Sequence, residues 1–160
     1  MLDNRRVIID EECKLADTGS AVIVASAAAT IDGVAKVYDT GGGYTDGLFV
    51  LDIETLTRNT SAASCNTIDV CLEGSTTSTF TTYAKTAGFK FGSKAAAFAH
   101  SRLGPDSTLA TTVADGASLR YKKPFINEWG GAVLRYLRVY TVFAGTTCNL
   151  GIKYKAYLSK

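Results

Sequence analysis

The sequence is poor in the side chains that most enzymes and metal sites use. Its 160 residues include a single His (His100), a single Met and two Pro. Histidine is the usual acid or base near neutral pH and the commonest metal ligand. A serine hydrolase would need a G-x-S-x-G turn, and the sequence contains none. We therefore expect no catalytic centre, no metal site and no cofactor.

Charge and hydrophobicity are also not concentrated in any segment. The 17 Lys and Arg nearly balance the 15 Asp and Glu, giving a net charge of +2, which is too small for a nucleic-acid clamp. No apolar run approaches the length of about 18 residues that suggests a membrane span, and residues 1–6 are not followed by the apolar core of a signal peptide. We expect neither nucleic acid nor a membrane as a partner, and synthesis outside the secretory pathway. In that compartment the Cys residues are expected to be thiols: Cys13, Cys65, Cys71 and Cys148.

Strand-forming residues are abundant instead. The chain has 20 Thr, 11 Val, 8 Tyr and 7 Phe, a usage typical of strands rather than helices. No internal repeat or linker divides it, so residues 1–160 are interpreted as one β domain. A chain of this length can bury roughly 70% of its unfolded surface.

Alternation of apolar and polar residues predicts about eight short strands. The clearest are 48–53, 67–73, 135–143 and 150–158, and in 67–73 the pattern indicates one buried and one solvated face. Weaker signals predict strands at 7–9, 21–25, 79–83, 89–91, 109–113 and 118–121. This spacing favours an antiparallel β-sandwich, with a jelly roll as its natural closure.

Three other segments interrupt the strand pattern. The Ala-rich stretch 93–103 has a competent N-cap in Ser93 and a stop signal in Gly104-Pro105, so it predicts one short helix. The glycine-rich segment 41–47 fits no phosphate-binding motif and is interpreted as a flexible loop. Asp115-Gly116 predicts a tight hairpin turn.

The outward faces of the last two strands are rich in aromatic and cationic residues. If the strands are neighbours, six side chains form one patch: Tyr136, Arg138, Tyr140, Lys153, Lys155 and Tyr157. Tyr and Arg are enriched in protein interfaces, so we favour a partner interface. The alternative is a row of ordinary exposed strand residues in which Lys discourages edge pairing.

Two further features are candidates for partner contact. The N-terminal run around Arg5, Arg6 and Ile8 is either a strand of the fold or an arm that adds to a partner's sheet edge. Trp129 is the only tryptophan in the chain.

The C-terminal part of the sequence resembles the capsid cement, or decoration, proteins of podovirus-type tailed bacteriophages. The specific match is residues 135–145, R-Y-L-R-V-Y-T-V-F-A-G. Weaker matches are the Met1-Leu2-Asp3 start and the segments 20–27, 67–73 and 156–158. Segments 41–47 and 93–124 look like elaborations of the family pattern.

The resemblance implies a jelly-roll structural protein without catalytic activity. Such a protein is made in the host cytoplasm, forms a dimer or trimer, and binds the major capsid protein on the outside of the virion. The alternative is a carbohydrate-binding β-sandwich of a phage tail or receptor-binding protein, with Trp129, Tyr121 and Tyr136 as sugar-stacking platforms.

Overall fold

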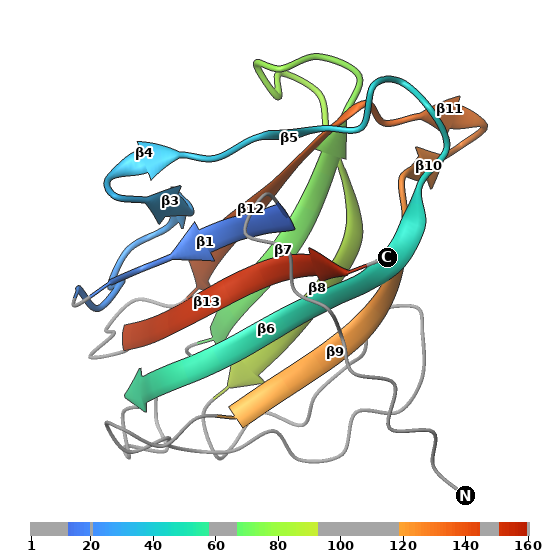
Figure 1. Ribbon diagram of the computed structural model, residues 1–160. Coiled ribbons are helices and arrows are strands. Elements are labelled where there is room, and N and C mark those ends of the chain that lie inside the picture. Colours follow the sequence, from blue (N-terminus) through green and yellow to red (C-terminus); the bar gives the residue numbers. More distant parts are fainter. Residues whose placement is uncertain (1–12, 20, 58–66, 93–118, 145–150, 160) are drawn as a thin grey trace, which may run out of the picture.

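The protein folds as two antiparallel sheets packed face to face (Figure 1). The computed structural model describes residues 13–19, 21–57, 67–92, 119–144 and 151–159. In these ranges every secondary-structure element is a β-strand, and the strands form sheets that pack against each other. This confirms the predicted all-β sandwich. The described residues contain no helix long and apolar enough to cross a membrane.

The front sheet in Figure 1 has four strands. Their order is β1 (Lys14–Asp17), β13 (Gly151–Ser159), β6 (Asp46–Thr57) and β9 (Leu119–Ile126). Because β13 and β6 occupy the middle, each has a partner on both sides.

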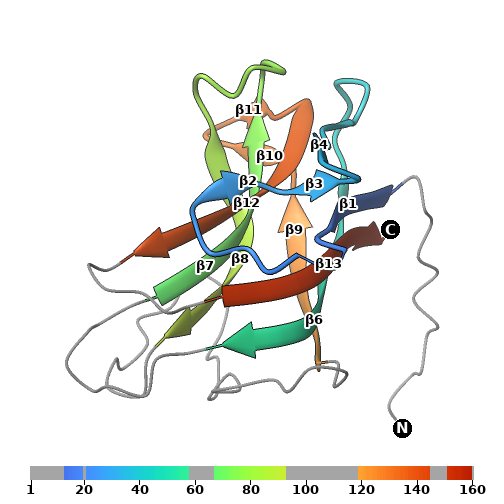
Figure 2. The same cartoon turned by 90° about the vertical axis from the view of Figure 1, so that its left-hand side faces the viewer.

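The back sheet is built around β12 and β7. Strand β12 (Tyr136–Ala144) pairs along its whole length with β7 (Thr67–Ser75), which in turn pairs with β8 (Ala84–Gly92). The other side of β12 carries two short strands, β2 (Ala27–Ala28) and β5 (Tyr38–Asp39). Figure 2 shows this layer from the side.

The strand order is that of a jelly roll. With β2 to β5 counted as one position and β10–β11 as an excursion, there are eight positions along the chain. The front sheet then reads first, eighth, third, sixth, and the back sheet second, seventh, fourth, fifth. The first and last strands therefore lie side by side although the whole chain separates them.

Two tight hairpins project from these sheets. Strands β3 (Thr30–Ile31) and β4 (Val34–Ala35) are joined by Asp32-Gly33, with φ of 51° and 79°. Strands β10 (Glu128–Trp129) and β11 (Ala132–Val133) are joined by Gly130-Gly131, with φ of 59° and 83°. Two successive positive φ angles define the type I′ turn, which suits the twist of a two-residue hairpin.

The core lies between the sheets and follows the predicted alternation. Leu137 and Val139 of β12 face Ile152 and Ala156 of β13, and all four are buried. Aromatic rings fill the part of the core between β6, β8 and β9, where the Phe49 and Phe89 centroids lie 5.6 Å apart. The remaining large core residues are Leu15, Leu51, Ile53, Leu56, Ile68, Val70, Leu72, Phe91, Phe125, Tyr154 and Leu158.

Two strand predictions need correction. Residues 79–83 do not form a strand; they belong to the β7–β8 connection, where Phe80 has a φ of 53°. The second face of residues 67–73 is solvated only in part: Asp69 is half-buried, and Cys71 and Glu73 are buried. The β7–β8 connection folds back and places the Phe80 ring beside Arg138 on the outer face of the back sheet, where Arg138 also pairs with Glu73.

Several other predictions fall on residues outside the described ranges. These are the strands at 7–9 and 109–113, the helix at 93–103 with His100, the turn at Asp115-Gly116, and Cys65 and Cys148. The predicted strand 21–25 is reduced to one bridge, between Ile23 and Ile152 of β13.

Candidate interaction surfaces

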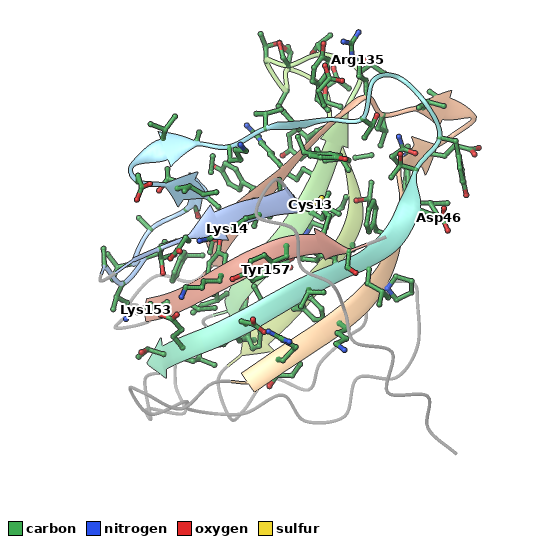
Figure 3. All side chains as sticks on the ribbon, in the orientation of Figure 1. Cys13, Lys14, Asp46, Arg135, Lys153 and Tyr157 are labelled. Carbon is green, nitrogen blue, oxygen red and sulfur yellow. The ribbon has the colours of Figure 1, made fainter. Side chains whose placement is uncertain are left out.

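The predicted basic and aromatic patch is divided between two faces of the molecule. Strand β12 belongs to the back sheet and β13 to the front sheet, so their outward side chains point to opposite sides. Figure 3 shows Lys153 and Tyr157 on the front face. The prediction assumed that successive strands pair, whereas the chain changes sheet between β12 and β13. The two strands are therefore not neighbours, and the prediction that the six side chains form one patch was wrong.

The cations on the outward face of β13 are already paired. Lys153 Nζ and Lys155 Nζ lie 3.3 Å and 3.1 Å from the two carboxylate oxygens of Glu54. Tyr157 is buried, and burial raises the pKa of its phenol. In the β13 half of the predicted patch, the positive charges of the two lysines are therefore neutralised by Glu54 and do not form a free cationic surface.

The β12 half is the centre of a compact group that we call the Arg138 cluster: Arg138, Glu73, Phe80, Tyr83 and Tyr140. The guanidinium carbon of Arg138 lies 4.2 Å from the Phe80 ring centroid, 5.0 Å from that of Tyr140 and 5.9 Å from that of Tyr83. Its Nε donates to Glu73 Oε2 over 2.9 Å, and a terminal nitrogen lies equally close to the same oxygen. Such stacking suits a planar cation that is partly shielded from water.

Local hydrogen bonds position the β7–β8 connection over the back sheet. Ser75 Oγ donates to the Thr82 carbonyl over 2.7 Å and accepts from the Thr77 amide over 3.1 Å. The positive φ of Phe80 then turns its ring onto Arg138. Sequence reasoning missed Phe80 and Tyr83 because it read this segment as a strand.

The cluster is largely satisfied by its own members. Arg138 is held by a carboxylate and three rings, and Phe80 is buried. Only Tyr83 is strongly exposed, at 54%. Tyr136, further along the same strand, lies under the guanidinium of Arg135 at 5.1 Å. The cluster can therefore offer a preformed Tyr and Arg contact surface, but it has no open charge.

Glu73 makes the cluster sensitive to pH. Burial raises the pKa of its carboxyl above the ordinary value of 4.5. The pairing with Arg138 lowers this pKa but is the smaller effect. Both contacting nitrogens of Arg138 are close to the same carboxylate oxygen, Oε2. A raised pKa in the folded state means that the group stabilises the fold most below its ordinary pKa and that this contribution is lost as pH rises through the folded value.

Urea unfolding of the native protein and of Glu73→Gln, which cannot titrate, measures this effect. The native protein's unfolding free energy relative to the variant is expected to fall as pH rises above the ordinary carboxyl pKa of 4.5. A relative stability that rises with pH above 4.5 would show that Arg138 dominates and would contradict the assigned direction.

Beside the cluster, Cys71 is not poised as a nucleophile. Burial raises the pKa of its thiol to about 12, and the adjacent Asp69 carboxylate adds to this shift. Lys85 Nζ lies 2.6 Å from Asp69 Oδ2, so the nearby cation is already paired. A thiol with this pKa stays protonated at neutral pH. Within the described ranges, no three His, Cys, Asp or Glu side chains are grouped to hold a metal ion.

A second feature lies at the end of the sandwich where the β5–β6 and β7–β8 connections and the β10–β11 hairpin meet (Figures 1 and 2). Asn127 is fully buried there. Its Oδ1 accepts from the Thr45 amide over 2.6 Å, and its Nδ2 donates to the carbonyls of Gly43 and Leu134 over 2.8 Å and 3.2 Å. This one side chain ties the glycine-rich segment to the hairpin.

The glycine-rich segment is consequently a fixed part of this end of the molecule. Gly41 and Gly42 have φ of 75° and 82°. The Thr40 amide donates to the Arg135 carbonyl over 2.9 Å. Asp46 and Gly47 already belong to β6. The prediction of a loop holds for the residues before Asp46 only.

The remaining predicted contact residues are dispersed. Trp129 lies on the β10–β11 hairpin and is 46% exposed. Tyr121 packs on buried Phe89 and Phe91 at 5.8 Å and 5.9 Å, so it cannot share a sugar platform with Trp129 and Tyr136. The candidates Arg5, Arg6 and Ile8 lie outside the described residues.

Comparisons of the chain with protein-family models, with curated proteins and with solved structures found no match.

Proposed function

We propose that this protein is a structural component of a virion, which binds the outside of a phage capsid and cements neighbouring major capsid subunits. The observation that carries the proposal is the sequence resemblance at residues 135–145. In the fold, residues 136–144 of this segment form β12, the strand that holds Arg138 and Tyr140 on an outer face.

The jelly-roll strand order supports the same proposal. Jelly rolls occur in viral coat proteins and in lectins. The carbohydrate-binding alternative loses support because Tyr121 packs against core rings.

The mechanism of cementing is thermodynamic linkage. A protein that binds assembled shell but not separate subunits stabilises the shell by about 2.7 kcal/mol per site when its free concentration is a hundredfold above Kd. A dimer or trimer would add avidity, because one assembly contacts several capsid subunits. Modest contacts repeated over the shell then resist disassembly.

Electron microscopy of purified virions tests the proposal. The expected result is a stoichiometric, symmetric array of this protein on the outer surface of the shell. A copy number of only a few per particle would exclude the cement role. Capsids lacking the protein are expected to disassemble at a lower temperature and to regain stability when the purified protein is added.

A further inference from the structure

A group of exposed residues lies where strands β6 and β9 of the front sheet meet the β10–β11 hairpin. We call it the loop-end face: Tyr44, Asp46, Ile126, Glu128 and Val133. Asp46 pairs with Ile126 and Glu128 with Val133, while Thr45 and Asn127 are joined by backbone and side-chain hydrogen bonds. Paired residues share a side of a sheet. Asp46 and Ile126 therefore share one side of the front sheet, and Glu128 and Val133 share one side of the adjoining β10–β11 hairpin.

The five residues are exposed, whereas several of their neighbours in the chain are buried. Thr45, Asn127 and Leu134, which alternate with the members of the face, are all buried. The apolar members are exposed: Tyr44 by 59%, Ile126 by 46% and Val133 by 37%. Trp129 adds another exposed ring on the same hairpin. Exposed apolar groups gathered at one end of a molecule are typical of an interaction site.

The face also carries two carboxylates without a cation. Within the part of the chain that the structure describes, neither Asp46 nor Glu128 has an ion-pair partner. Every other Asp and Glu in the described ranges is paired, except Asp32 on the β3–β4 hairpin. Arg135, also at this end, is held in two hydrogen bonds of 2.8 Å by Asp39. The unmet charge on this face is therefore negative.

The backbone under the face is rigidly connected. Asn127 joins its strands through the Thr45 amide and the Gly43 and Leu134 carbonyls. A preformed surface loses less conformational entropy when it binds. The Arg138 cluster, by comparison, already pairs its own cation.

We propose that the loop-end face is the surface that docks on the capsid shell, and that the shell presents Lys or Arg side chains around an apolar centre to it. This inference rests on the proposed function. Charge complementarity selects this partner. In a two-fold contact between copies of this chain, the same patch would meet itself and bring its carboxylates together.

The experiment measures co-sedimentation of this protein with capsids assembled from the major capsid protein of the same virion. The double variant Asp46→Asn, Glu128→Gln removes the two charges without changing side-chain size. It is expected to bind at least about tenfold more weakly at low salt and to lose most of the salt dependence of binding. The matched control, Asp32→Asn, removes an equally unpaired carboxylate elsewhere and is expected to bind like the native protein.

An apolar variant, Ile126→Ser, is expected to weaken binding at all salt concentrations, with an unchanged melting temperature as the folding control. Failure of the native protein to bind capsids would reject the proposed function itself. Native binding that both variants retain would reject only the loop-end face. A changed oligomeric state of the double variant in solution would make this face a contact between copies and would also overturn the inference.

Discussion

Replacing Asn127 by Ala is expected to lower the free energy of unfolding by about 3 kcal/mol, because the change leaves several buried backbone groups without partners at roughly 1–3 kcal/mol each. The affected groups are the Thr45 amide and the carbonyls of Gly43 and Leu134. Chemical denaturation with fluorescence of the single Trp129 on the adjacent hairpin reports the transition.

Two further variants separate the hydrogen bonds of Asn127 from its size. Asn127→Asp keeps the shape but cannot donate to the two carbonyls and adds a buried charge, so it is expected to be at least as unstable as the Ala variant. Glu128→Gln changes the neighbouring exposed residue and is expected to stay within about 0.5 kcal/mol of the native protein. An Asn127→Ala protein of native stability would show that the network does not hold this end together.

Replacing Tyr154 by Phe is expected to destabilise the protein by about 2 kcal/mol through loss of one buried hydrogen bond. Tyr154 of β13 and Thr141 of β12 are both fully buried, and their hydroxyl oxygens lie 2.7 Å apart. The bond crosses the core from one sheet to the other. Without the Tyr154 hydroxyl, the Thr141 hydroxyl is left without this hydrogen-bond partner in an apolar environment.

A double-mutant cycle tests whether this one contact accounts for the loss. Thr141→Val removes the second hydroxyl, so the Tyr154→Phe, Thr141→Val protein is expected to be more stable than the sum of the two single changes predicts. Urea unfolding of the four proteins gives the coupling. Strictly additive effects would mean that the two hydroxyls do not depend on each other.

The candidate surfaces could be predicted from the sequence only in part. Arg138 and Tyr140 were placed on an outward face because alternation along a single strand suffices for that. Phe80 could not be placed there from the sequence. It has a positive φ and its ring packs against Arg138, and neither feature leaves a signal in the neighbouring residues. The loop-end face was missed apart from its neighbour Trp129, because its members come from segments that are more than 75 residues apart in the chain.

What the sequence alone determined is the class of structure and the inward or outward position of most strand residues. A side-chain period of two is a property of each strand by itself, so residues such as Leu137, Val139 and Ile152 could be assigned to the core without knowing any partner. Which strands pair was decided only by the tertiary structure. Closing two sheets over one core separated β12 from β13, and the same closure brought residues 44–46 beside 126–128, because burial of apolar area depends on the whole fold and not on neighbours in the chain.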